Sequence, residues 1–397
     1  MDFFYVRLLF QKNKVLQMKI PLLVNFALLL CFSSSNVFSN NSKNDLFIYV
    51  GTYTSEESKG IYLLKMNKET GKIEIQSTTG NVINPSFLAI NKTKDFLYSV
   101  NEVSDYENSN SGSISSFKID KLTKELVFIN KKSSLGADPC YIAIDDINNF
   151  VLTANYSGGN ISIHPIDETG ALLDAADVAQ HVGSSINLKR QTKPHAHSIY
   201  LDSKNKFAYA VDLGIDKILV YSINSETGKL ILRSAADIEP GSGPRHFVIH
   251  QNGKFAYVIN ELNNKIISFN VDKNNGSLDL IDTYSTLPAD FNETSYCADI
   301  HIHPNGKFLY GSNRGHNSIA VFEINEETGK LTNIGFESTQ GNWPRNFVID
   351  PDGNFMLVAN QKSNNINVFK INNTTGLLEF TGISETVPSP VCLIFYN

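Results

Sequence analysis

The chain has 397 residues, of which 42% are hydrophobic and 19% are charged, and its formal net charge is −6. These values are typical of a globular protein with a large core, and they argue against a disordered chain. The weakly acidic balance gives no reason to expect a nucleic-acid partner, because nucleic acids select basic surfaces.

The N-terminal segment has the pattern of a secretory signal peptide. Lys19 precedes the apolar run IPLLVNFALLL at residues 20–30, and a Ser-rich stretch follows that run. The run is too short to span a bilayer comfortably. We therefore interpret residues 1–39 as a signal peptide with an extra leader, cleaved after Ser39, and translation starting at Met18 explains the leader. A buried strand or a short anchor is the alternative.

A protein with this segment is expected to be exported to the periplasm or the cell exterior; without a functional signal, the protein would be cytoplasmic. Cys31 is a candidate lipidation site, although the bulky Leu30 before it does not match the small residue expected there. The mature chain is expected to have no transmembrane span. Cys140, Cys297 and Cys392 show no zinc-binding spacing and lie in apolar segments, which predicts buried free thiols.

Six segments of the chain repeat one pattern, with a period of roughly 50 residues that is typical of propellers and arrays. The pattern is usually an opening proline, a β-rich run, a polar turn, a Phe or Leu with an aromatic residue, and a closing Asn. The segments are NPSFLAINKTKDFLYSVNE, DPCYIAIDDINNFVLTANY, KPHAHSIYLDSKNKFAYAVDL, GPRHFVIHQNGKFAYVINE, CADIHIHPNGKFLYGSNRG and WPRNFVIDPDGNFMLVANQ.

Each repeat predicts four antiparallel strands. The segments above supply two strands, a third such as IISFNV or INVFKI follows, and a turn of the type ETGKL leads into the fourth. The Asn-Gly, Asp-Gly and Thr-Gly pairs provide the positive φ angles that tight hairpins require. Strands such as FAYVIN are apolar on both faces, which suits sheets that stack face to face.

Half a repeat remains at each end of the propeller region. DLFIYVGTYT and GIYLLKM lie at the front, and PSPVCLIFY at the back matches the first strand of a repeat. Together they complete a seventh blade, which closes the ring and removes exposed sheet edges. We predict an all-β protein in which residues 40–397 form one seven-bladed β-propeller, closed by strands from both chain ends. Two separate β-sandwiches are the alternative.

Charged residues recur where the first strand of a repeat begins and the second ends. Arg245 opens a first strand and Glu261 closes the following one. Because these strands run antiparallel, the two positions lie at the same edge, and we expect them to meet near the axis in a water-filled pocket. The same reasoning places further polar residues at this rim: Asn101, Glu102, Asn155, His195, His197, Asp212, Asp299, His301, Asn313, Arg314, Arg345, Asn360 and Gln361.

A purely structural interpretation competes with a functional one. Propeller rims are polar, an Asn at a strand end caps a turn, and Arg345 could pair with a neighbouring carboxylate as part of the scaffold. Two arginines, a histidine and a glutamate at one rim would destabilise the fold if they were unpaired. Their convergence therefore favours a site for a polar ligand.

These motifs resemble the lactonase family of seven-bladed propellers, which includes propeller-type 6-phosphogluconolactonases and a fungal carboxy-muconate cyclase. The resemblance rests on KPHAHS, VDLGIDKI, GPRHFVIHQNGKFAYVINE and HPNGKFLYGSNRGHNSIAVF and covers nearly all of residues 46–397. It implies a functional cluster of a His, an Arg, a Glu and a second Arg. By motif matching these are His197, Arg245, Glu261 and Arg314.

The resemblance implies a hydrolase that opens a sugar lactone to the free acid. His197 or Glu261 would accept the proton of the attacking water, and Arg245 and Arg314 would hold the developing oxyanion or an acidic group. His195, Asp212, Asp299, His301 and Arg345 are candidate substrate-binding residues. Export would separate the enzyme from phosphorylated cytosolic sugars, so an unphosphorylated aldonolactone is an alternative substrate.

Two other functions remain open on the sequence. The same face could bind a surface polymer without catalysis, or the chain could close a lactone ring as the cyclase does. The His195-x-His197 and His301-x-His303 pairs are weak evidence for zinc, and we expect neither a metal nor another cofactor. The expected partner is a small sugar lactone, and the oligomeric state is left open.

Overall fold

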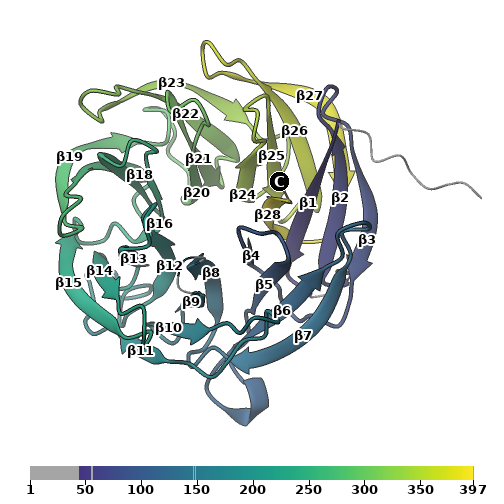
Figure 1. Ribbon diagram of the computed structural model, residues 1–397. Helices are drawn as coiled ribbons and strands as arrows, with labels where there is room; N and C mark the ends of the chain where they lie inside the picture. Colours follow the sequence, from purple (N-terminus) through teal and green to yellow (C-terminus); the bar gives the residue numbers. More distant parts are fainter. Residues whose placement is uncertain (1–43, 55–56, 146, 148, 397) are drawn as a thin grey trace, which may run out of the picture. The chain divides into compact units, whose positions relative to one another are not determined.

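Each repeat of the sequence forms one four-stranded antiparallel sheet. The computed structural model describes residues 44–54, 57–145, 147 and 149–396. These residues form 28 strands and a single short 3-10 helix, η1 (Tyr106–Asn108). The strands make seven sheets of four strands each, arranged as the blades of a propeller (Figure 1). The predicted fold is confirmed.

The first three blades follow the chain in order. Their strands are β4 (Leu88–Ile90), β5 (Phe96–Asn101), β6 (Ser113–Ile119) and β7 (Leu126–Ser133); β8 (Pro139–Asp145), β9 (Phe150–Asn155), β10 (Asn160–Pro165) and β11 (Asp177–Gln180); β12 (Ala196–Leu201), β13 (Phe207–Asp212), β14 (Lys217–Ile223) and β15 (Leu230–Asp237). In each blade the first strand lies innermost in the ring (Figure 1).

The next three blades repeat this arrangement. Their strands are β16 (Pro244–Ile249), β17 (Phe255–Asn260), β18 (Lys265–Val271) and β19 (Leu278–Ser285); β20 (Tyr296–Ile302), β21 (Phe308–Arg314), β22 (Ser318–Ile324) and β23 (Leu331–Ser338); β24 (Pro344–Ile349), β25 (Phe355–Asn360), β26 (Asn365–Ile371) and β27 (Leu378–Thr386).

The seventh blade joins the two ends of the propeller. Its strand order is β28 (Pro390–Tyr396), β1 (Asp45–Thr52), β2 (Ile61–Asn67) and β3 (Ile73–Thr79). Tyr49 of β1 pairs with Ile394 of β28 on one side and with Leu63 of β2 on the other. The predicted closure by strands from both chain ends is therefore confirmed.

The core lies between the faces of neighbouring blades. All six residues of β17 are buried, because both faces of this strand are covered by adjoining sheets. One apolar cluster joins Tyr209 and Val211 of β13 to Phe247 and Val258 of the next blade. Apolar side chains on both faces of the strands are thus what stacks the blades side by side.

In three blades, the tyrosine of a Phe-x-Tyr sequence in the second strand bonds to a glycine turn of the next blade. The hydroxyl of Tyr257 donates to the carbonyl of Gly329, 3.1 Å away in the Thr-Gly turn of the following blade. Gly329 has φ +69°, and a Cβ there would lie 2.5 Å from the ring of Phe255. The turn thus requires glycine both for its backbone angle and for the close approach of the aromatic ring.

The cysteines and the N-terminal segment can be compared with their predictions as far as the structure describes them. Cys140, Cys297 and Cys392 are buried free thiols, as predicted. The predicted signal segment, residues 1–39 with Met18 and Cys31, lies outside the described residues. Within the described ranges, we find no helix with the length and apolar character of a transmembrane span.

Candidate active site

Irregularities at the start of four inner strands point side chains toward the axis of the propeller. The pairing register shifts between Pro139 and Tyr141, between Ala196 and Ser198, between Pro244 and His246, and between Pro344 and Asn346. The extra residues at these bulges are Cys140, His197, Arg245 and Arg345. A bulge redirects its side chain away from the regular alternation, as is common beside active sites.

A second set of side chains comes from the ends of the second strands. The residue directly after the strand, or the last residue in the case of β21, faces the axis in six blades. These residues are Tyr53, Glu102, Tyr156, Glu261, Arg314 and Gln361. Because the start of one strand and the end of its antiparallel neighbour share an edge, the two sets meet at one end of the central channel.

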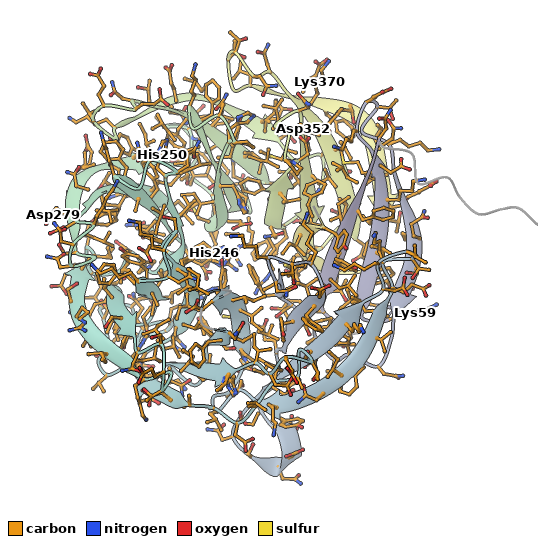
Figure 2. The ribbon with its side chains drawn as sticks, viewed as in Figure 1. Lys59, His246, His250, Asp279, Asp352 and Lys370 are labelled. Atoms are coloured by element: carbon orange, nitrogen blue, oxygen red, sulfur yellow. The ribbon has the colours of Figure 1, made fainter. Side chains whose placement is uncertain are left out.

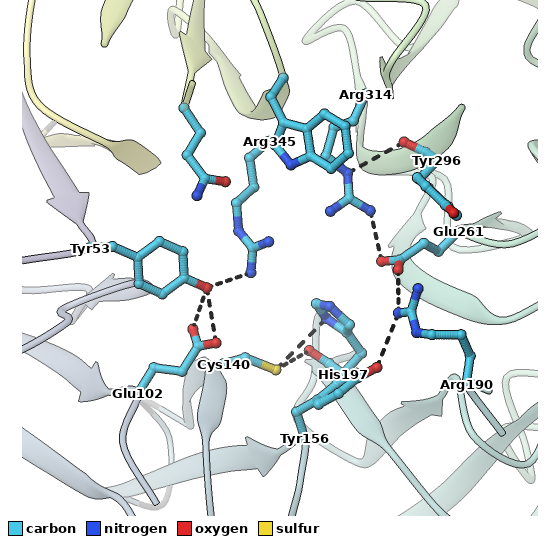
Figure 3. Close-up of a pocket in the computed structure, with 12 residues that line it drawn as sticks. Tyr53, Glu102, Cys140, Tyr156, Arg190, His197, Glu261, Tyr296, Arg314 and Arg345 are labelled. Carbon is cyan, nitrogen blue, oxygen red and sulfur yellow. Dashed lines mark hydrogen bonds and ion pairs between the residues drawn. The ribbon is translucent and has the colours of Figure 1, made fainter. Parts of the chain in front are cut away.

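All members of the two sets except Arg245 line a cavity of about 430 Å³ (Figure 3). Figure 3 shows Tyr53 and Glu102 on one side of the cavity and Glu261 with Arg190 on the opposite side. Three further residues come from outside the two sets, namely Arg190, Tyr296 and Trp343. The complete lining is Tyr53, Glu102, Cys140, Tyr156, Arg190, His197, Glu261, Tyr296, Arg314, Trp343, Arg345 and Gln361.

Glu261 is surrounded by guanidinium groups. Its Oε2 atom lies 3.0 Å from Arg245 Nε and 2.8 Å from Arg314 Nη2, and its Oε1 atom lies 2.6 Å from Arg190 Nη2. Burial alone would raise the pKa of Glu261, but Arg314, Arg245 and Arg190 hold it far below its usual range. Glu261 is therefore an ionised carboxylate with little tendency to take up a proton.

Arg245 supports this carboxylate from behind the cavity wall. Its side chain is only 2% exposed, and its Nη1 atom donates to the carbonyl of Ala298 at 2.7 Å. Burial and the charges of Arg314 and Arg345 lower the pKa of Arg245 to about 10, so it remains protonated at neutral pH. The structure thus brings Arg245 into contact with Glu261 but not into the lining of the cavity.

Glu102 has a different environment. Both of its carboxyl oxygens lie 2.9 Å from the Tyr53 hydroxyl, and Oε2 also accepts a hydrogen bond from Ser86. The Tyr53 hydroxyl in turn accepts a hydrogen bond of 2.8 Å from Arg345 Nη2. Burial raises the pKa of Glu102, and the nearby charge of Arg345 only partly offsets that effect.

His197 lies between these two walls (Figure 3). Its Nδ1 atom is 3.8 Å from the Cys140 sulfur, and no hydrogen bond within the described part of the chain reaches its Nε2 atom. Burial and the positive charge of Arg245 hold the pKa of His197 well below its usual range. His197 is therefore neutral at physiological pH.

Two other predicted residues lie beside the cavity without lining it. The His195 ring stacks on Tyr156 at 4.4 Å, and its Nδ1 atom contacts the Tyr156 carbonyl oxygen at 3.0 Å. Asp212 is fully buried and accepts hydrogen bonds from the backbone N–H groups of His195 and Gly214, with His181 Nδ1 at 2.6 Å. Asp212 thus holds the turn that carries His195 and does not reach the cavity.

Asp299 and His301 lie further along the channel rather than at its rim. Asp299 lies within the register shift between Cys297 and Ile300, one residue after the repeat position that Arg245 occupies in its blade. Its oxygens contact His246 at 2.7 Å, His301 at 3.0 Å and Asn346. His246 is near the axis in Figure 2, whereas Asp279 lies at the outer edge. Burial would raise the pKa of Asp299, but His301 and His246 keep it far below its usual range.

Asp299 and His301 line a separate space of about 390 Å³, whose other walls are mostly apolar residues with Asn346 among them. The expectation that these two residues share a cavity with His197 is therefore corrected by the structure. The physical reason is that an inner strand advances along the axis with each residue. Arg345, by contrast, does share the cavity with His197, Glu261 and Arg314.

Several lining residues were missing from the predicted cluster. Tyr53 and Tyr156 occupy the same repeat position as Glu261, so aligning the repeats with one another would have identified them. Cys140 occupies the bulge position of its repeat, like Arg245. Arg190 comes from the long connection between β11 and β12 and has no counterpart in the repeat pattern. Nothing in the sequence signalled that it reaches Glu261.

The residues that line the cavity suit a reaction that needs stabilisation of charge and transfer of a proton. Among the described residues, no group of three or more His, Cys, Asp or Glu side chains is arranged to hold a metal ion. The lining instead combines three arginines, two glutamates and a neutral histidine. Such a site can bind an anionic or strongly polar ligand and can stabilise negative charge that develops on it.

Comparisons with known proteins agree with this chemistry. A family model described as a seven-bladed β-propeller lactonase matches residues 47–395. A 6-phosphogluconolactonase of Bacillus subtilis is 38% identical over 300 residues, which are 76% of this chain and 84% of that protein. A 6-phosphogluconolactonase of Formosa agariphila is 39% identical over 309 residues, 76% of this chain and 86% of that protein.

The fold has a related solved structure with a different named activity. The periplasmic gluconolactonase of Pseudomonas aeruginosa superimposes with a TM-score of 0.82 and 29% identity. The match covers 88% of this chain and 99% of that one.

Proposed function

The chain belongs to the lactonase family of seven-bladed β-propellers, and we propose that it hydrolyses a sugar lactone to the free aldonic acid. The observation that carries this proposal is the convergence of His197, Glu261, Arg314 and Arg345 on one cavity. The product of the reaction is a carboxylate. The surplus of arginine over glutamate in the lining favours both that product and the oxyanion that precedes it.

The arginines have unequal roles in this proposal. Arg245, Arg190 and Arg314 each form an ion pair with Glu261, so this carboxylate holds all three in place. Among the described residues, Arg345 forms no ion pair; its guanidinium donates to the Tyr53 hydroxyl, lies 5.3 Å from the centre of the Tyr53 ring, and lines the cavity. We therefore assign to Arg345 the binding of the lactone carbonyl oxygen, and to Arg314 the binding of polar groups elsewhere on the sugar.

His197 and Glu261 are the two candidates for the proton acceptor that the family resemblance implies. Both have pKa values well below their usual ranges, which makes each of them a weak base. His197 with a neutral imidazole can orient the attacking water or a sugar hydroxyl. Glu261 holds three cationic side chains in place and shapes one wall of the site.

We further propose that the protein acts outside the cytoplasm, because Lys19 and the apolar run at 20–30 have the pattern of an export signal. The named relatives include both 6-phosphogluconolactonases and a periplasmic gluconolactonase. An exported enzyme would meet unphosphorylated aldonolactones, and the P. aeruginosa protein is a precedent for that location. Mass spectrometry of the mature N-terminus would test the export proposal directly.

The proposed reaction is tested by following acid release from glucono-δ-lactone and from its 6-phosphate. The purified protein is expected to accelerate at least one reaction above spontaneous hydrolysis. An Arg245→Ala variant is expected to lose turnover or substrate affinity, with thermal melting as the control for folding. No acceleration across a panel of lactones would contradict the proposal and favour a binding propeller.

A further inference from the structure

Glu102 has no part in the roles assigned above. Glu102 lines the cavity and is half-buried, in contact with two neutral hydroxyl groups, those of Tyr53 and Ser86. Within the described ranges no Lys or Arg forms an ion pair with it, in contrast to Glu261. The two carboxyl groups of one cavity therefore have opposite electrostatic environments.

This contrast decides which of the two carboxylates takes up a proton more readily. Three arginines stabilise the ionised form of Glu261, whereas burial without a direct cationic partner raises the pKa of Glu102. A pair of carboxyl groups whose environments drive their pKa values apart is a recurrent arrangement in enzymes that need both a fixed charge and a proton-transfer group. Glu102 has the environment expected of the proton-transfer group.

Geometry places an anion-binding group beside Glu102. The Tyr53 hydroxyl accepts from Arg345, because a guanidinium can only donate, and it must therefore direct its own hydrogen to the Glu102 carboxylate. The carboxylate and the guanidinium are thus joined through one hydroxyl, on the same wall of the cavity (Figure 3). A lactone carbonyl bound by Arg345 would lie next to a water held by Glu102.

We propose that Glu102 is the general base of this cavity, acting with Arg345 as the neighbouring oxyanion-binding group; the assignment rests on the lactonase function proposed above. The water oxygen bonds to the lactone carbonyl carbon while Glu102 accepts one water proton. The carbonyl π electrons move to the oxygen beside Arg345. When the oxyanion collapses, the bond from that carbon to the ring oxygen breaks, and the ring oxygen takes the proton back from Glu102.

Tyr53 and Ser86 are positioning residues in this scheme. Both donate to the Glu102 carboxylate and fix its orientation in the cavity. Ser86 also favours the ionised form, so its removal should raise the pKa of Glu102 further. A Ser86→Ala variant is therefore a probe that alters the basicity of Glu102 without replacing the carboxylate.

The first test compares Glu102→Gln with Glu379→Gln, an exposed control on the outer strand β27. Loss of a general base predicts a kcat that is about 10²–10⁴-fold lower for Glu102→Gln, with KM changed only a few-fold. Wild-type kcat/KM should fall on the acid side with an apparent pKa above the usual range of a glutamate. This acid limb should move to higher pH in Ser86→Ala and disappear from the residual activity of Glu102→Gln. A Glu102→Gln variant with wild-type kcat and an unchanged acid limb overturns the proposal.

The second test does not require turnover. Gluconate binding is measured by calorimetry at pH 6 in two buffers of different ionisation enthalpy. An anion bound at Arg345 should raise the pKa of Glu102, so binding should take up protons in the wild type and in Glu379→Gln but not in Glu102→Gln. If the wild type hydrolyses no lactone, the proposed function fails. In that case, this measurement alone tests whether Glu102 is the group that takes up a proton. Absence of binding, or binding without proton uptake, then overturns the assignment.

Discussion

Glu102 and Glu261 occupy the same position of the repeat in two different blades, yet they have become chemically different residues. Each follows the second strand of its blade directly and faces the same cavity. Glu261 is paired with three guanidinium groups, and Glu102 with two hydroxyl groups. The comparison teaches that the repeat determines where a side chain points, and its neighbours determine what that side chain can do.

The neighbours differ because they come from different parts of the chain. The residue after the opening proline is Arg245 in the blade of Glu261 and Ser86 in the blade of Glu102. The adjoining blades add Arg314 to the first carboxylate and Tyr53 to the second. The long connection before β12 adds Arg190 to Glu261 alone. Three independent differences in sequence therefore make the environment of Glu261 different from that of Glu102.

The largest expected effect comes from neutralising each glutamate in turn. Glu261→Gln leaves buried Arg245 without its counter-charge, and we expect the free energy of unfolding to fall by about 3–5 kcal/mol. Glu102→Gln keeps a neutral partner for Tyr53 and Ser86, so its loss should be about 1 kcal/mol or less. Urea denaturation at pH 7 would measure both values. Equal losses would show that the two environments do not differ as described.

Replacing Arg345 should lower the catalytic rate and leave the stability of the fold nearly unchanged. Arg345→Met deletes the proposed oxyanion-binding group, and we expect a kcat about 10²–10³-fold lower. Since its only hydrogen bond among described side chains is to Tyr53, the melting temperature should change little. Steady-state kinetics with the best lactone substrate, together with a thermal melt, would check this. Full activity in a folded variant would contradict the role of Arg345.

The pH dependence of stability should have opposite signs for the two residues. The pKa of Glu261 is lowered in the folded state, so its stabilising contribution is present above its unfolded value and is lost as the pH falls below it. The pKa of Glu102 is raised, so its contribution is greatest at low pH and declines as the pH rises through its folded value.

These signs can be measured by unfolding the wild type and both Gln variants in urea between pH 4 and pH 8. The difference between wild type and Glu261→Gln should shrink toward pH 4. The difference between wild type and Glu102→Gln should favour the wild type more at pH 4 than at pH 8. The same trend in both variants would contradict the contrast.

The smallest expected effect concerns Arg190, the most exposed of the three arginines that pair with Glu261. The side chain of Arg190 is 35% exposed, so its ion pair is partly screened by solvent. We expect Arg190→Met to lower the free energy of unfolding by about 1 kcal/mol or less, and by less still in high salt. Unfolding in low and in high salt would measure this. A loss as large as that of Glu261→Gln would mean that Arg190 is essential to the wall.

The sequence was sufficient to predict most of the architecture. The period of the Phe-x-Tyr and Thr-Gly motifs identifies the blades, and the half repeats at the two ends identify the closing blade. It also placed His197, Glu261, Arg314 and Arg345 at one rim, where they line one cavity. These predictions succeed because strand alternation and antiparallel pairing depend on local sequence, and the same local pattern occurs in several repeats.

The observed lining differs from the predicted rim where position along the axis or a long connection mattered. Asp299 lies one residue after the repeat position that Arg245 occupies, and it faces His246 and a second space along the channel. Asp212 turned inward to hold the backbone before β12. Arg190 entered the site from a connection that no repeat describes.

By itself, the sequence determined a ring of seven sheets and the rim at which its polar residues gather, because both follow from periodic patterns of side chains. Only the tertiary structure decided that Glu261 is a fixed charge and that Glu102 is not. The pKa of a carboxyl group depends on burial and on charges a few ångströms away. Those neighbours come from other blades and from a loop. They are far from the glutamates along the chain, so local sequence patterns do not predict them.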